Sequence, residues 1–153
     1  MNKALVTETA DALFKNAEKD IMNIDTLIST PKYPVDHMYD IICFHATQAV
    51  EKFLKGYIIN NNRTVEKIHH LDILHKIAVE IDNSFYTIMD DCLLLNEYVP
   101  NIKYDAENII TKQNMEDIIK SMQTISNFSP IKLLRDLFSK KYNYEIVTET
   151  TID

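Results

Sequence analysis

Residues 39–57 read YDIICFHATQAVEKFLKGY and are the most informative stretch of the chain. Their apolar side chains recur at intervals of three and four residues, which is typical of one face of a helix. This face consists of Ile42, Cys43, Ala46, Ala49, Val50, Phe53, Leu54 and Tyr57. The pattern predicts one long helix that begins near Asp36, acting as N-cap, and ends near Ile59, just before a run of asparagines.

A second side of this helix is polar. His45, Gln48, Lys52 and Lys55 are spaced i, i+3, i+7 and i+10, so a helix aligns them along one line. We call these four residues the polar seam. Glu51 precedes Lys55 by four residues, and this spacing predicts an ion pair that stabilises the helix by a few tenths of a kcal/mol.

The same periodicity predicts helices on both sides of this segment. Their expected ranges are residues 3–28, about 70–81, 85 to about 98, 114 onward, and 129 to about 138. Ser84 and Asn114 are expected as N-caps, and residues 101–113, which lack a clean period, as an ordered loop. Five or so helices with short connections predict an all-α fold, an up-and-down bundle of about five helices. We expect residues 1–140 to form one domain and residues 141–153 a C-terminal tail.

The composition is that of a folded globular protein. Hydrophobic residues make up 46% of the 153 residues and charged residues 25%, far from the pattern of a disordered chain. No apolar run approaches the roughly 18 residues that a membrane-spanning helix needs, and the first ten residues lack the apolar core of a signal peptide. We therefore expect a cytoplasmic protein with no membrane contact.

The net charge of -7 argues against nucleic-acid binding by bulk electrostatics. Between residues 48 and 76, however, the balance changes sign. This segment carries Lys52, Lys55, Arg63, Lys67 and Lys76 against Glu51, Glu66 and Asp72. The charge pattern thus indicates the same part of the chain as the polar seam.

Several types of site are excluded by the residue types present. The single glycine, Gly56, cannot supply the glycine-rich loop that brings backbone N–H groups to a phosphate. Cys43 and Cys92 both fall in apolar helical patterns, so we expect buried packing residues.

His69, His70 and His75 lack the three- or four-residue spacing of helical metal ligands, and for His70 we expect a hydrogen bond that fixes the turn. We expect no metal and no cofactor.

The segment FHATQAVEKFLKGYI, residues 44–58, resembles the core helix of the HEPN family (higher eukaryotes and prokaryotes nucleotide-binding domain), whose usual pattern is close to FHAxQAxEKxLKAxL. The matching residues are Phe44, His45, Ala46, Gln48, Ala49, Glu51, Lys52, Leu54 and Lys55. Gly56 stands where alanine is common. His70-Leu71-Asp72 is similar to the family's His-Asp-Leu turn, with the last two residues in swapped order. Residues 98–105 are similar to its later tyrosine and Arg-Tyr-Pro segment, with Lys103 in place of the arginine.

The resemblance, which covers roughly residues 4–128, implies a helical bundle that forms homodimers and binds a nucleotide or RNA. It also implies a minimal nucleotidyltransferase as partner protein, in toxin–antitoxin pairs. The nucleotide-binding residues expected on this basis line one groove: His45, Gln48, Lys52, Lys55, His70 and Lys103. The alternative is that the seam is a solvated or dimer-facing side of the helix, in a non-catalytic dimeric scaffold.

A second alternative is catalytic. Some family members are metal-independent endoribonucleases with an Arg-x4-6-His motif, and Arg63 with His69 satisfies this spacing, as does Arg63 with His70. A histidine can transfer the protons of RNA cleavage, and an arginine can stabilise the charge of the transition state. Against this, two arginines and five histidines give such a spacing readily by chance. Catalytic members also usually carry the pair nearer their last helices.

Overall fold

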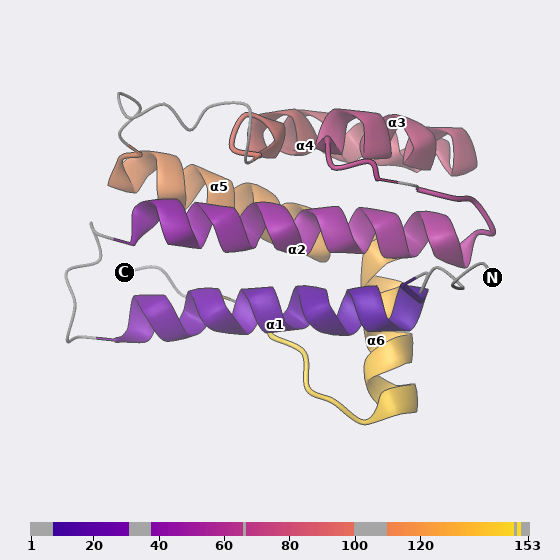
Figure 1. Cartoon of the computed structure of the whole chain (residues 1–153), viewed down its shortest axis with the longest axis horizontal. Helices are drawn as coiled ribbons and strands as arrows, with labels where there is room; N and C mark the ends of the chain where they lie inside the picture. Colours follow the sequence, from indigo (N-terminus) through magenta and orange to yellow (C-terminus); the bar gives the residue numbers. More distant parts are fainter. Residues whose placement is uncertain (1–7, 31–37, 66, 100–109, 149, 151–153) are drawn as a thin grey trace, which may run out of the picture.

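The computed structural model describes residues 8–30, 38–65, 67–99, 110–148 and 150. Every regular element in these ranges is helical, so the prediction of an all-α bundle is confirmed. The central element is α2 (Tyr39–Asn60), which packs against α1 (Ala10–Ser29), α3 (Leu71–Ile81), α5 (Lys112–Ser126) and α6 (Ser129–Tyr142). Figure 1 shows α1 and α2 side by side, the α3 and α4 layer on the other side of α2, and α6 lying across α1.

The first two helices start at positions set by their caps. Thr9 is extended and its hydroxyl accepts a hydrogen bond from the Ala12 N–H, so α1 begins at Ala10. The helix thus starts at Ala10 and not at Lys3 as predicted, and residues 3–7 of the predicted range lie outside the described residues. Asp36, the predicted N-cap of α2, lies outside the described residues, and the residue that precedes the helix in the structure is Met38.

The fourth helical segment differs from the prediction. Its first part is a 3-10 helix, η2 (Asn83–Ile88), and the α-helix α4 spans only Met89–Asn96. Ser84 is not the N-cap, because the Asp82 carboxylate accepts from the Ser84 N–H at 2.9 Å and starts the segment earlier. A 3-10 helix aligns residues three apart, which directs both Phe85 and Ile88 into the core.

The start of α5 was also predicted too late. Thr111, rather than Asn114, is the N-cap, and the two residues form a capping box with reciprocal hydrogen bonds of 3.0 and 3.1 Å. Residues 101–109 of the predicted loop lie outside the described residues, and the last two residues of that loop, 112 and 113, belong to α5. The next helix, α6, continues to Tyr142, about one turn beyond its predicted end, and stops at Asn143 with a φ of 54°.

The single glycine lies where α1 and α2 approach each other. A Cβ atom added to Gly56 would lie 2.5 Å from Cδ1 and 2.6 Å from Cε1 of Phe14 on α1. Phe14 is fully buried and packs edge-to-face against Phe53 of α2. The position at which alanine is common in the resembling pattern therefore carries glycine here, because the Phe14 ring occupies the space.

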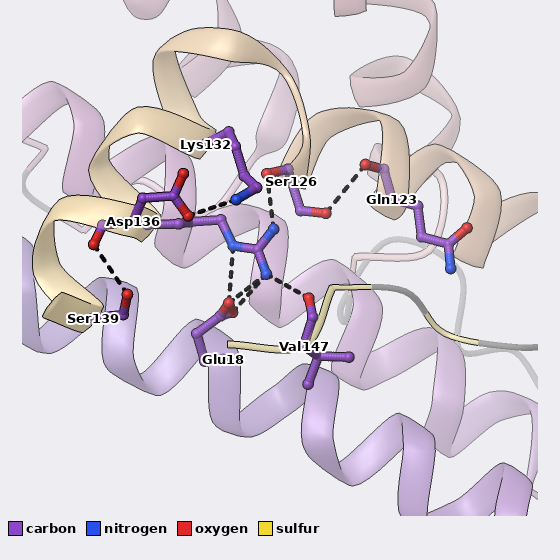
Figure 2. Close-up of polar contacts among 8 residues, drawn as sticks. Glu18, Gln123, Ser126, Lys132, Asp136, Ser139 and Val147 are labelled. Carbon is purple, nitrogen blue, oxygen red and sulfur yellow. Dashed lines mark hydrogen bonds and ion pairs between the residues drawn. The ribbon is translucent and has the colours of Figure 1, made fainter. Parts of the chain in front are cut away.

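A buried ion pair joins α6 to α1 (Figure 2). Arg135 donates from Nε to Oε1 of Glu18 at 2.8 Å and from Nη2 to Oε2 at 3.0 Å. Its remaining donors reach the carbonyls of Ser126 at 3.0 Å and Val147 at 2.9 Å. Burial raises the pKa of the Glu18 carboxyl, and the Arg135 charge opposes this rise. One guanidinium thus holds together α1, the turn before α6 and the segment that follows α6.

We predict that Gly56→Ala lowers the free energy of unfolding by up to about 2 kcal/mol. The added methyl group overpacks against Phe14 at a cost of about 1–3 kcal/mol, and the gain of about 1 kcal/mol in helix propensity offsets part of this cost. Urea unfolding of the single variant and of Phe14→Leu/Gly56→Ala measures the effect. The double variant should lose less than the sum of the two single changes, and a Gly56→Ala protein as stable as the original would contradict the prediction.

We predict that Arg135→Ala lowers the free energy of unfolding by about 3–5 kcal/mol, because it leaves the Glu18 carboxylate buried without its counter-charge. The matched control is Lys132→Ala on the same helix, which removes an exposed pair with Asp136 and should cost at most about 1 kcal/mol. The double variant Glu18→Leu/Arg135→Leu should lose less unfolding free energy than Arg135→Ala alone, because it leaves no unpaired charge. Strictly additive single effects at Glu18 and Arg135 would refute this coupling.

Candidate functional site

The polar seam lies along one side of α2, and its first half is held by a carboxylate from α1. Asp20, which is buried, accepts from His45 Nδ1 on Oδ1 at 2.9 Å and from Lys52 Nζ on Oδ2 at 2.5 Å. His45 and Lys52 are two helical turns apart, and Asp20 spans that distance. Gln48 lies one turn from each of them along α2, so the seam is continuous between them.

This contact fixes the proton on the His45 ring. A carboxylate only accepts hydrogen bonds, so Nδ1 of His45 carries a proton and Nε2 of the neutral ring is an acceptor. The His45 side chain is 21% exposed and the Lys52 side chain 26%, so both retain contact with solvent. The arrangement can present an imidazole nitrogen and an ammonium group to a ligand in fixed positions.

The second half of the seam is held by another carboxylate. Glu51, buried on α2, accepts from Lys55 Nζ at 3.2 Å, so the predicted i, i+4 pair is confirmed. His69, from the segment before α3, places Nδ1 at 3.6 Å from Glu51 Oε2 and 3.4 Å from Lys55 Nζ. The His69 side chain is 64% exposed. Asp20 thus holds one histidine and one lysine, whereas Glu51 holds Lys55, which in turn contacts His69.

The seam is electrically balanced rather than a bare basic patch. The charges of Lys52 and Lys55 are matched by those of Asp20 and Glu51. The change of sign seen along residues 48–76 does not include Asp20, which comes from a distant part of the sequence. The seam can therefore recognise a ligand by directed hydrogen bonds more readily than by long-range attraction.

The residues proposed for catalysis have separate partners. Arg63 donates from Nη2 to Glu80 Oε2 of α3 at 2.8 Å, while His69 faces Glu51 and Lys55. His70 is the N-cap residue of α3 and makes no side-chain capping hydrogen bond.

The turn that His70 was expected to fix is held from another helix. The Leu71 N–H donates to Asn96 Oδ1 at 2.8 Å, so Asn96 supplies the capping hydrogen bond that His70 does not make. The hydrogen bond expected of the His70 side chain stays a prediction. Asn96 ends α4, and only the packing of α3 against α4 brings it to this place.

The remaining expected sites are as follows. Lys103 lies outside the described residues. His75 is buried and its Nε2 is 2.7 Å from the Phe85 carbonyl oxygen, so His75 has a structural role.

Cys43 and Cys92 are buried as predicted, and burial raises the pKa of each thiol to about 12. Among the described residues, no group of three or more His, Cys, Asp or Glu side chains is placed so that it could hold a metal ion.

Sequence reasoning missed the two carboxylates that organise the seam. The signal for Asp20 was present, because it falls between Ala17 and Ile24 on the buried side of α1, where an acid needs a partner. Glu51 was identified only as the partner of Lys55. Neither could be linked to a histidine from spacing alone, since His45 and His69 come from other segments.

Within the part of the chain that the structure describes, none of the helices is both long and apolar enough to span a membrane.

Comparison with known proteins gives one match. A model of the HEPN domain matches residues 10–132, which is most of the chain and includes the seam and the segment from Arg63 to His70. No curated protein and no solved structure matches the chain. On the strength of this match over α1 to the start of α6, with the helical architecture it requires, the chain belongs to the HEPN domain family.

Proposed function

We propose that this HEPN domain binds a nucleotide or RNA through the polar seam of α2, with His70 and Lys103 as further binding residues. The observation that carries the proposal is the Asp20 contact, which holds His45 and Lys52 on either side of Gln48. Buried carboxylates that orient exposed cations are typical of sites whose side chains must keep a fixed geometry.

The seam offers the groups that a phosphate and a base edge need. Lys52 has three N–H groups, and one of them is engaged with Asp20, so the ammonium can donate to a phosphate oxygen as well. Gln48 carries both a donor and an acceptor, which suits the edge of a base. Because the seam is neutral overall, we expect weak attraction at a distance and a specific contact at short range.

Membership of the family supports the wider proposal. We infer a cytoplasmic homodimer that acts as the partner or toxin component beside a minimal nucleotidyltransferase. In the alternative, non-catalytic scaffold, the same seam would contact only a second subunit.

We predict saturable binding when labelled nucleotides or a short single-stranded RNA are titrated at low salt. Lys52→Ala should weaken it roughly tenfold, because a charge-assisted hydrogen bond is lost. Lys120→Ala, which removes the same charge from an exposed position on α5, is the matched control and should have little effect.

The Asp20→Asn variant separates orientation from charge in this experiment. Removing a negative charge should tighten anion binding if attraction alone matters, whereas loss of orientation should weaken it. Thermal unfolding of the variant confirms that it is folded. If the original protein shows no saturable binding at millimolar ligand, the proposal is refuted and the non-catalytic scaffold remains.

A second candidate is a metal-independent endoribonuclease, and one observation favours it. The exposed His69 imidazole lies beside Lys55 and Glu51, so a proton-transfer group and a cation occur together. Arg63, by contrast, is paired with Glu80, and a catalytic role would require it to leave that partner.

Because we propose a binding domain, we predict that RNA incubated with the protein in EDTA is cleaved no faster than with His69→Ala, His70→Ala or Arg63→Ala. A general acid or base contributes about 100-fold or more to such a reaction. Cleavage by the original protein that falls by that factor in His69→Ala would establish the ribonuclease instead. Mass spectrometry of the RNA ends would identify the 2′,3′-cyclic phosphate product of that reaction.

A further inference from the structure

Two exposed apolar stripes remain outside the proposed binding site. The first runs along η2 and α4 and consists of Tyr86, Met89 and Leu93, which are 63%, 39% and 44% exposed. Their i, i+3, i+7 spacing places them on one line, so they form a continuous surface rather than scattered residues. We call this the α4 stripe.

The second stripe is on α6. Leu133 and Leu137 are 67% and 56% exposed and lie four residues apart, on the side of the helix opposite the buried Ile131 and Arg135. The match to the HEPN domain ends at residue 132, so this surface belongs to the part of the chain that the family model does not cover. We call it the α6 ridge.

The two surfaces carry opposite charges. The α4 stripe is flanked by Asp90 and Glu97, both exposed, and neither forms an ion pair within the described ranges. The α6 ridge leads into Lys140 and Lys141, also exposed, at the C-terminal end of its helix. An apolar centre with an acidic margin thus complements an apolar centre with a basic margin.

One molecule cannot bring these surfaces together. The α4 helix packs on α3 and α5, while α6 packs mainly on α1, and Figure 1 shows α4 and the outer part of α6 on opposite sides of the bundle. We propose that the α4 stripe docks the α6 ridge of a second copy of this chain. The contact is head-to-tail, so each copy uses two different surfaces, and copies can add in series or close into a ring.

The size of the surfaces sets the strength of the contact. One helix laid against another buries less than the roughly 800 Å² per partner of a standard stable interface. The association is therefore weak, and its charged margins make it sensitive to salt. It does not depend on the proposed nucleotide binding, because neither surface includes a residue of the seam.

Charge reversal tests this contact. Sedimentation velocity measures association of the full chain beyond the inferred homodimer, at protein concentrations from about 10 μM to 1 mM. One variant carries Lys140→Glu/Lys141→Glu and the other Asp90→Lys/Glu97→Lys. Each alone should associate at least about tenfold more weakly than the original protein, because like charges then face each other. An equimolar mixture should recover the association, since each variant then meets its complement.

A charge change elsewhere on the surface serves as the control. Lys19→Glu/Lys120→Glu makes the same charge change on exposed residues outside both surfaces and should leave association unchanged. Circular dichroism shows that each variant is folded. A protein that forms no species larger than the homodimer would overturn the proposal. So would larger species that persist unchanged in either variant, or variants that weaken their formation but do not recover it when mixed.

Discussion

The close contact of α1 with α2 is the constraint on which the rest of the molecule depends. Phe14 lies against the backbone of Gly56, and a side chain at that position would push the two helices apart. The same approach lets a short aspartate side chain, Asp20, reach both His45 and Lys52 on the neighbouring helix. A packing detail in the core therefore controls the geometry of polar groups at the surface.

The Arg135–Glu18 pair plays the corresponding role at the other end of the chain. The three partners of Arg135 come from α1, the end of α5 and the segment after α6, so the C-terminal part is tied to the first helix. A buried ion pair adds little net stability over an apolar pair, but it is strongly directional because unpaired donors and acceptors are costly. We interpret it as a contact that specifies where α6 lies across α1.

The seam illustrates how charge counting along a sequence differs from charge in space. Residues 48–76 carry more basic than acidic side chains, yet Asp20 pairs with Lys52 and Glu80 with Arg63, and both acids lie outside this stretch. The surface that results is neutral and organised, which suits recognition at contact distance. The basic and acidic margins of the α6 ridge and the α4 stripe are the places where charge is left for a partner.

By itself the sequence determined the fold class, the central helix, the family and the set of candidate side chains, because helical periodicity and the FHATQAVEKFLKGY pattern are local properties. The periodicity did not fix the helix boundaries, because capping hydrogen bonds at Thr9, Asp82 and Thr111 set them, and neighbouring polar residues could have served as caps. Only the tertiary structure decided which side chains meet. Asp20 and His45 are 25 residues apart, and Glu18 and Arg135 are 117 apart, so no spacing rule relates them. The packing of α1 on α2 and α6 buries both carboxylates and brings each of them next to a positively charged or hydrogen-bonding side chain of the neighbouring helix.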